Sequence, residues 1–515
     1  MNKTAKSFGI VTLFSIATRL ISFIFKMWMS HTLGAEVVGQ YQIALSVLMM
    51  IFTLTAGAPT VLSRKIAEAN SNIKKQNSLL TASVIMGVAS SAIICAIFYA
   101  LGNKISPLFS NPQSMPLFFI MLPTLLTSTL YGSIRSWFWG RKKFVSFSST
   151  ELLDEIIKIA LSALFASGII SSLTGATGIA LAMTISDLVC VIVLAIIYFA
   201  SGGKFAKPTG FKDLTMRTLP LSATRIITAL VASLTAFVVP KLLVKSGMSL
   251  EQATAEYGRV SGMALPLIMA PVAFISALSV VLIPDVAELR SKGDINAVKS
   301  KFATSMLFST LIAALFFTVY LSLGRSLGKL LFGDEQAGKF VSYCSLMLFP
   351  IATAQATTPM LNSLGKENST FIHTLAGGLV MLPCIIFLPK YIDVYAMALS
   401  SGACFLLTSM LNFITLSKEV GAFADVKKMA ITITFSLPIA LTALFSAKLL
   451  ERYANSLTAI IVTGVYIVFF FFLASTALKV VDIEACISLF KPAYTSSVRT
   501  HAKPRTRARK ASRRA

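Results

Sequence analysis

The chain has 515 residues, of which 55% are hydrophobic and 13% are charged. Soluble domains contain about 25% charged residues, so this composition excludes a soluble globular protein. It predicts an all-α, multi-pass protein of the cell (plasma) membrane. The formal net charge of +25 could suit a nucleic-acid partner. Because most of this charge lies in the segments between apolar spans, we expect no nucleic acid as a partner.

About fourteen apolar segments are long enough to cross a membrane as helices. They cover residues 8–31, 40–62, 79–101, 115–139, 146–170, 176–200, 214–240, 259–283, 304–323, 340–362, 370–388, 392–415, 429–448 and 457–478. With the N-terminus inside, Lys and Arg are roughly threefold more abundant in inward than in outward segments, so both termini are expected in the cytoplasm. The first span is too long for a cleaved signal peptide and is expected to remain as an anchor.

Two near-identical words lie deep inside apolar spans, at residues 17–21 (ATRLI) and 223–227 (ATRII). Further matches follow in the same order at the ends of later spans. They pair 62–68 with 282–288 and 140–142 with 365–367. Six spans separate the copies, and an even number preserves orientation, so the pattern predicts two parallel six-helix lobes.

The repeat sets the expected domain boundaries. We expect an N-lobe over 1–204, a C-lobe over 205–420, two extra helices over 421–480 and a basic tail over 481–515. The tail cannot bury a core and is expected to be disordered in the cytoplasm. Its expected partners are anionic membrane lipids, and recruitment of cell-wall synthesis enzymes is the alternative. We expect the protein to be a monomer.

The central arginines of the repeated words, Arg19 and Arg225, are the leading site candidates. Each lies roughly 16 Å into its span, near the middle of a ~30 Å hydrocarbon core. A charge there costs at least ~2.5–3.5 kcal/mol, so it is expected to face a cavity or a buried partner. Lys26 lies on the face of Arg19, two turns later, and either joins it or extends to the interface.

Three acids accompany these cations in the N-lobe spans. Asp154 and Lys158 are four residues apart and are expected to pair on one helix. Glu155 and Asp187 are then left to compensate the other cations or to bind Na⁺ or H⁺. Because the embedded cations outnumber these acids, the sequence favours an anionic substrate over a cationic one.

Enzyme chemistry has little support. The six cysteines are scattered and the three histidines are isolated, so no metal site or cofactor is predicted. Residues 333–340 (GDEQAGKF) nearly match a phosphate-binding loop, but Phe340 replaces its Ser/Thr and the segment is an outward loop. Any energy source would then be Na⁺, H⁺ or the membrane potential. Two prolines in the eighth span, Pro266 and Pro271, predict a broken helix there.

Five segments together resemble the polysaccharide-flippase branch of the multidrug/oligosaccharidyl-lipid/polysaccharide exporter superfamily, in particular its stage V sporulation protein B and lipid II flippase group. They are 17–23 (ATRLISF), 33–41 (LGAEVVGQY), 62–69 (LSRKIAEA), 219–225 (LPLSATR) and 257–266 (YGRVSGMALP). The likeness spans about 8–480. Three residues depart from the usual pattern: Gln40 replaces an acid, and Lys26 and Lys158 replace arginines.

This resemblance implies fourteen helices around a cation-lined cavity, with the last two forming a lipid-facing groove. It implies movement of an undecaprenyl-diphosphate-linked sugar, in first place lipid II, across the membrane, with Arg19, Lys26 and Arg259 binding the diphosphate. A teichoic-acid, capsule or spore-cortex precursor is the alternative cargo. A cation-coupled multidrug exporter and a scaffold acting through the tail are the alternative functions.

Truncation of the tail tests the scaffold alternative. A chain ending at Val480 should insert and support growth like the full chain, because the tail lies outside the predicted fold. Complementation of a flippase-deficient strain, with membrane abundance measured in parallel, checks this. Normal insertion without complementation would favour the scaffold.

Overall fold

The computed structural model describes residues 3–55, 57–69, 72–166, 175–275, 286, 289–290, 293–421, 424–453 and 455–481. Over these ranges the chain is helical and contains no β-strand. Ten of the helices are long and apolar enough to cross a membrane. The predicted all-α, multi-pass fold class is thereby confirmed.

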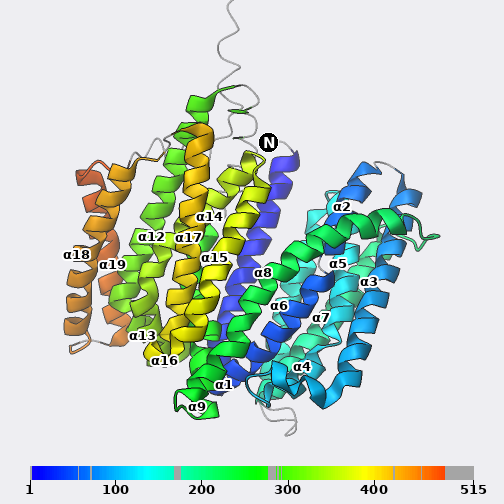
Figure 1. Ribbon diagram of the computed structural model, residues 1–515, viewed down its shortest axis with the longest axis horizontal. Helices are drawn as coiled ribbons and strands as arrows, with labels where there is room; N and C mark the ends of the chain where they lie inside the picture. Colours follow the sequence, from blue (N-terminus) through cyan, green and yellow to red (C-terminus); the bar gives the residue numbers. More distant parts are fainter. Residues whose placement is uncertain are drawn as a thin grey trace, which may run out of the picture.

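The first nine helical elements lie on the right of Figure 1. They are α1 (Lys3–Thr55), α2 (Gly57–Glu68), α3 (Ile73–Leu101), the 3₁₀ helix η1 (Gly102–Leu108), α4 (Ser114–Met121), α5 (Thr124–Gly140), α6 (Phe144–Ala166), α7 (Gly175–Ala200) and α8 (Phe211–Lys245). We call the side where α1 begins the upper face, and the opposite side, where α1 bends at Gly34, the lower face.

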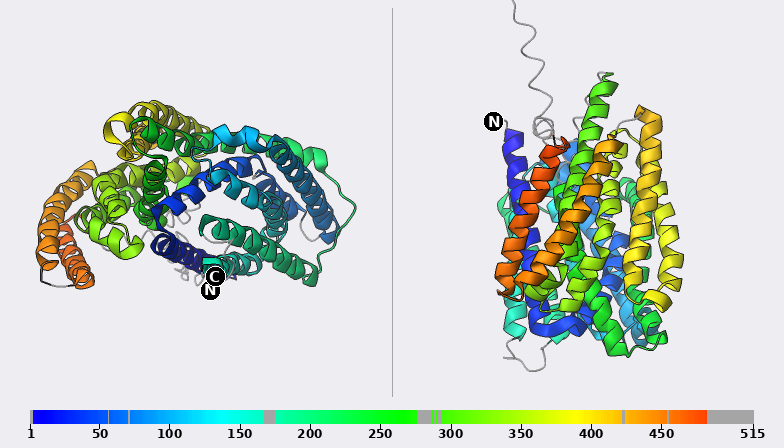
Figure 2. Two further views of the ribbon diagram at one scale, coloured as in Figure 1. Left: turned by 90° about the horizontal axis from the view of Figure 1, so that it is seen from below. Right: turned by 90° about the vertical axis from the view of Figure 1, so that its left-hand side faces the viewer.

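The remaining helices form the left part of Figure 1. They are α9 (Leu250–Gly258), η3 (Arg259–Ala264), α10 (Leu265–Met269), α12 (Ile295–Phe332), α13 (Glu335–Cys344), η4 (Ser345–Met347), α14 (Leu348–Ser363), α15 (Glu367–Phe387), α16 (Pro389–Ile392), α17 (Tyr395–Val420), α18 (Val426–Leu450) and α19 (Ser456–Ala477). The last two pack on α12 and stand at one edge of the molecule (Figure 2).

The first two predicted spans are joined by a sharp bend instead of a loop. Gly34 adopts φ 78° and ψ 172°, and helix continues on both sides of it. In Figure 1, α1 descends from the upper face and returns toward it after this bend. Glycine reaches a positive φ without the clash that a Cβ would cause, so one residue reverses the chain here.

The eighth predicted span is irregular, as its prolines suggest. The π-helical segment η3 precedes α10, and α10 ends at Met269, directly before a turn at residues 270–271. The π segment was not predicted, because a π-helix has no clear sequence signal. Such segments occur frequently at functional sites.

Helix α1 and the α9–η3 segment approach each other very closely at the lower face. A Cβ added to Gly258 would lie 2.2 Å from the Ala35 carbonyl oxygen, and one added to Gly39 would lie 2.1 Å from that of Thr254. A Cβ added to Gly262 would lie 2.2 Å from the Val38 side chain. Only glycine allows backbones to pack at this distance. We call this contact the lower seam.

Hydrogen bonds reinforce the contact beside the lower seam. The buried Asn111 side chain donates to Thr254 Oγ1 at 3.0 Å, and the Ser110 hydroxyl donates to the Ala236 carbonyl at 2.8 Å. Lys241 Nζ donates to the Pro107 carbonyl at 2.6 Å. The 107–111 segment is thereby tied to α8 and α9.

The segment between α7 and α8 is held against α3. Ser78 donates to the Lys207 carbonyl at 2.6 Å, and the Ala206 amide donates to Thr81 Oγ1 at 3.1 Å. This segment contains the lobe boundary predicted between residues 204 and 205. Its hydrogen bonds fix it to the N-terminal half up to Gly210, where φ is +84° and α8 begins.

Gly258→Ala should destabilise the protein, because the new methyl group overlaps the α1 backbone at the lower seam. We expect a loss of about 1–3 kcal/mol, the usual range for overpacking. Gly464→Ala is the matched control, since a Cβ there meets nothing within 4 Å. Thermal unfolding of both variants in detergent checks this, and equal melting temperatures would contradict a tight seam.

Candidate functional site

One face of α6 carries four charged residues inside the N-terminal half. Glu151, Asp154, Glu155 and Lys158 follow the spacing i, i+3, i+4 and i+7, so their side chains share one side of the helix. Asp187 joins them from α7, which packs on α6. We call Glu151, Asp154, Glu155 and Asp187 the acidic cluster.

The acidic cluster lines a cavity of about 220 Å³. Hydroxyl groups complete much of the wall. They come from Thr18 on α1 and from Thr127, Ser128 and Tyr131 on α5. The sequence predicted a cavity with surplus cations. This cavity lies within the N-terminal half and differs from the predicted one, because all four charged groups in its lining are carboxylates.

Lys158 compensates two of these carboxylates at once. Its Nζ lies 3.2 Å from Asp154 Oδ2, the pair that the sequence predicts, and 3.3 Å from Glu155 Oε1. The Lys158 side chain is only 13% exposed. The sequence left Glu155 as a partner for other cations. In the structure it shares the ammonium group of Lys158 with Asp154.

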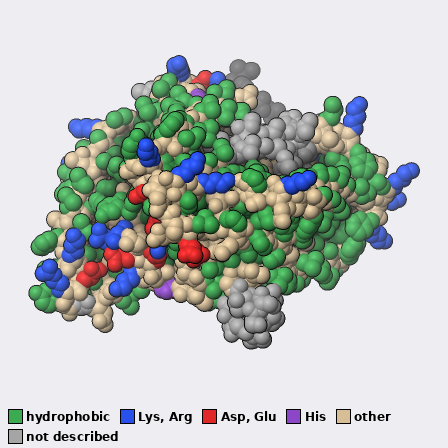
Figure 3. All heavy atoms as spheres, turned by 60° about the horizontal axis from the view of Figure 1, so that its bottom comes forward, with side chains coloured by type: hydrophobic (Ala, Val, Ile, Leu, Met, Phe, Trp, Pro, Cys, Tyr) green, Lys and Arg blue, Asp and Glu red, His purple; other side chains and the backbone are tan. Residues whose placement is uncertain are grey.

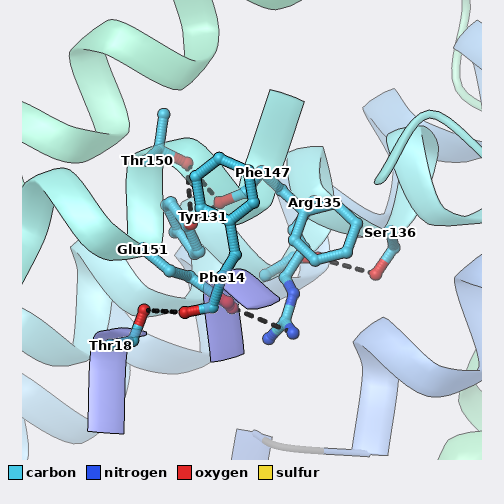
Figure 4. A network of polar contacts seen from close by, with 9 residues as sticks. Phe14, Thr18, Tyr131, Arg135, Ser136, Phe147, Thr150 and Glu151 are labelled. Atoms are coloured by element: carbon cyan, nitrogen blue, oxygen red, sulfur yellow. Dashed lines mark hydrogen bonds and ion pairs between the residues drawn. The ribbon is translucent and has the colours of Figure 1, made fainter. Parts of the chain in front are cut away.

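A second cation enters the cluster from α5. Arg135 lies 2.9 Å from Glu151 Oε1, and its guanidinium stacks on the rings of Phe147 and Trp139, 4.8 and 5.3 Å from their centroids (Figure 4). Tyr131 borders the same network and donates to the Phe147 carbonyl at 3.1 Å. Such stacking stabilises a cation away from bulk water.

Asp187 is the member of the acidic cluster that has no direct partner. Within the described part of the chain it makes no hydrogen bond and no ion pair, and its side chain is half-buried. Lys158 and the other carboxylates of the cluster still act on it electrostatically. The ion pairs that the structure describes here join two cations, Arg135 and Lys158, to the other three acids of the cluster.

The α1 cations lie next to this cluster. Lys26 is half-buried and is attracted by Glu155. Arg19 follows Thr18, which lines the cavity, and its side chain is exposed. Neither cation forms an ion pair with any residue that the structure describes. Arg225 lies in α8, but its side chain is outside the described residues.

Arg259 lies apart from the other candidates, at the start of η3. It pairs with Glu256 at 2.8 Å and with Asp334, the residue that caps α13, at 2.7 Å. Figure 3, in which the lower face comes forward, shows acidic and basic side chains gathered on one part of that face. Arg259 is therefore charge-compensated here, and an anion would have to displace two carboxylates to bind it.

A second hollow lies on the surface of α19. This groove of about 790 Å³ is almost wholly apolar. Its walls are Ile461, Gly464, Val465, Val468, Phe469, Phe472, Leu473 and Thr476. These residues share one side of α19 and leave a shallow channel along it.

Several site residues were not singled out from the sequence. Glu151 lies one turn before Asp154, and Arg135 is a charge inside an apolar helix, so the rule that placed Arg19 in a site also applies to them. The α5 hydroxyls could not have been found, because Ser and Thr are common in membrane helices and their facing depends on packing.

The comparisons with known proteins agree with this architecture. The family model described as "Polysaccharide biosynthesis protein" matches residues 4–290, more than half of the chain. The chain belongs to the polysaccharide biosynthesis protein family. The resemblance inferred from the sequence motifs is therefore confirmed.

Two curated relatives are sporulation proteins of Bacillus subtilis. Stage V sporulation protein B is 21% identical over 439 residues, which cover 81% of this chain and 84% of that protein. Sporulation protein YkvU is 24% identical over 319 residues, covering 59% and 70%. The first likeness extends beyond the family model into the C-terminal helices.

Solved structures share the fold at low sequence identity. An inward closed conformation of the lipid II flippase MurJ matches with a TM-score of 0.72 and 13% identity, covering 91% of this chain and 99% of that one. An inward-facing multidrug resistance MATE transporter of the MOP superfamily matches with a TM-score of 0.67 and 13% identity, covering 80% and 98%. These descriptions name transporters and flippases and no enzyme. This member of the polysaccharide biosynthesis family is a multi-pass protein of the cell membrane.

Lys158→Met should destabilise the protein strongly, because it leaves two partly buried carboxylates without their cation. We expect a loss of about 3 kcal/mol in the free energy of unfolding. Adding Asp154→Asn and Glu155→Gln should restore most of it. Lys339→Met is the matched control: Lys339 lies 3.8 Å from Glu335, whose side chain is 54% exposed. Thermal unfolding in detergent measures the loss of stability in each variant. Equal losses of stability for Lys158→Met and Lys339→Met would show that the cluster is not a partly buried charge network.

Proposed function

We propose that this protein is a flippase that moves an undecaprenyl-diphosphate-linked sugar from the inner to the outer leaflet, with lipid II as its first candidate cargo. Family membership, the MurJ-like fold and the charged face of α1 support this function. Precursors of teichoic acid, capsule or spore cortex are the alternative cargoes, and the likeness to two sporulation proteins supports the last of these.

The observation that carries the proposal is the state of Arg19 and Lys26. Both lie in an apolar helix, seven residues apart, and neither is ion-paired within the described chain. Other embedded cations, Arg135, Lys158 and Arg259, all have carboxylate partners. An unpaired cation in a membrane helix requires an anion or water, and a diphosphate supplies the anion.

The polyprenyl chain of such a substrate needs an apolar path. The groove on α19 offers one, because its walls are aliphatic and aromatic along most of the helix. In our proposal the diphosphate binds between the halves beside Arg19 and Lys26, with Arg225 and Arg259 as further contacts. The lipid tail lies against α18 and α19.

The full topology belongs to the same proposal. We propose fourteen membrane spans with both termini in the cytoplasm, so that the upper face is cytoplasmic and the lower face is outward. The lobes would be 1–204 and 205–420, followed by two helices over 421–480. The lower seam then closes the outward side, and transport requires that it open as the lobes rock.

Charge compensation in the acidic cluster supports ion coupling. Asp187 has no direct partner, and it faces Asp154, Glu155 and Lys158 around one cavity. Na⁺ or H⁺ binding there, or the membrane potential acting on Lys26 and Arg19, would bias the conformational cycle. No other cofactor is required. We further propose that the tail binds anionic lipids and that the protein acts as a monomer.

A cation-coupled multidrug exporter is the second candidate, and the acid-lined cavity favours it. Carboxylates around a hydroxyl-rich pocket suit an organic cation. The two functions predict opposite sensitivities. Asp187→Asn should abolish drug resistance in an exporter, whereas Arg19→Ala should abolish precursor translocation in a flippase.

Arg19→Ala should abolish flipping without loss of the protein from the membrane. Arg19→Lys should retain part of the activity, because an ammonium group lacks the planar pair of donors that a guanidinium offers to phosphate. Rescue of a strain depleted of its lipid II flippase measures the effect.

Arg452→Ala is the control for this experiment, since Arg452 is exposed in the turn between α18 and α19. It should rescue like the unmodified chain. If Arg19→Ala at normal abundance also rescues fully, Arg19 does not bind the diphosphate. If the unmodified chain fails to rescue, lipid II is not the cargo in that strain.

A further inference from the structure

A polar network in the C-terminal half has been assigned no role so far. His373 of α15 projects between α14 and α17, half-buried. Its Nδ1 lies 2.8 Å from Asn412 Oδ1, and its Nε2 lies 3.4 Å from Thr415 Oγ1. Asn412 is fully buried. An ionisable residue inside a membrane bundle is costly to place and marks a functional site by default.

The hydrogen bonds of Thr357, at the end of the network away from His373, determine the direction of the others. Thr357 donates its hydroxyl proton to the Thr353 carbonyl at 2.8 Å, so it accepts from Asn412 Nδ2 at 3.1 Å. The same amide nitrogen lies 3.1 Å from Thr358 Oγ1. Asn412 therefore turns its oxygen toward His373, and Nδ1 must carry a proton to donate to it.

The second ring nitrogen is then the atom that gains or loses a proton. When Nε2 is bare, the Thr415 hydroxyl donates to it. When Nε2 is protonated, it donates to Thr415 Oγ1, and the hydroxyl proton can turn to a carbonyl of its own helix, as those of Thr353 and Thr357 do. Both protonation states of His373 thus keep both ring nitrogens hydrogen-bonded. A histidine held only for packing would not need such a partner.

Among the side chains that the structure describes around His373, none is a counterion for the charged form. Helix α14 has no charged residue, and in the described structure no carboxylate pairs with His373. The charged residues on the elements packed against α15, and on α15 itself, are Glu367, Lys390, Lys418, Glu419 and, on α8, Lys212, Asp213, Arg217, Arg225, Lys241 and Lys245. Of these, Glu419 is four residues beyond Thr415 and already pairs with Lys366 at 2.7 Å.

We propose that His373 is a proton-binding site that couples proton movement to the conformational cycle. Nε2 takes a proton from water on one side and releases it on the other, and no further reactant is consumed. Because an imidazolium without a counterion is unfavourable in the closed apolar bundle, protonation favours a conformation that hydrates the site. The coupling of this cycle to a cargo rests on the proposed flippase function, but proton binding itself does not.

The test measures conformation without any cargo. Spin labels on Lys104→Cys and Lys245→Cys, in a chain without its native cysteines, report the opening of the lower face, where both side chains are exposed. In liposomes the label distance should change between about pH 5.5 and 8. His373→Gln, which can keep the hydrogen bonds but cannot titrate, should remove that change.

Two further variants keep the result decisive. His31→Gln is the matched control on α1, an exposed histidine next to the Leu330 carbonyl, and should keep the pH response. Thr415→Val removes the partner of Nε2 and should shift the midpoint of the response. Thr415→Val also tests the proposal if His373→Gln does not fold. A pH response that persists unchanged in His373→Gln or Thr415→Val, or is absent from the unmodified chain, would overturn the proposal.

A transport arm separates this proposal from the flippase function. With a purified lipid-linked precursor in the same liposomes, a pH gradient should accelerate flipping by the unmodified chain and not by His373→Gln. A chain that shows the His373-dependent conformational change but moves no precursor would refute the cargo and support the proton site. A chain that flips the precursor equally with and without the gradient would support the cargo and refute the proton site.

Discussion

The cost of holding charge inside an apolar bundle organises the N-terminal half of this protein. A single uncompensated carboxylate or ammonium group in a low-dielectric interior costs several kcal/mol, so such groups occur here as a network. Lys158 binds two acids of α6, and Arg135 binds a third while its guanidinium stacks on aromatic rings. This leaves Asp187 and the α1 cations as groups whose compensation can change during a transport cycle.

Close backbone packing is the second constraint, and it acts at the opposite end of α1. At the lower seam, Gly39 and Gly258 let carbonyl groups approach where a Cβ would overlap, and Gly262 leaves room for the Val38 side chain. Buried side chains of both segments, among them Val38 and Val260, also pack into one hydrophobic core. Opening the lower seam therefore exposes apolar surface, which an alternate conformation has to cover again.

The sequence predicts the fold class far better than it predicts the site. Hydrophobic length locates membrane helices because backbone groups in lipid must be paired within a helix. The sequence also identifies Asp154 and Lys158 as partners, because residues four apart lie on the same side of a helix. The sequence could not show that Glu151 and Asp187 line one cavity, or that Arg259 pairs with Asp334, because these residues lie far apart in the chain.

The two halves place different polar groups in their interiors, although the sequence predicts that they are repeats. Around α6 and α7 the polar groups are carboxylates held by Lys and Arg. Around α15 and α17 they are an imidazole, an amide and hydroxyl groups without a formal counterion. The ion pairs of the first network join groups of opposite charge, whereas the second network holds a single ionisable ring. In the proposed transport cycle, this difference would let one half bind the cargo anion and the other respond to protons.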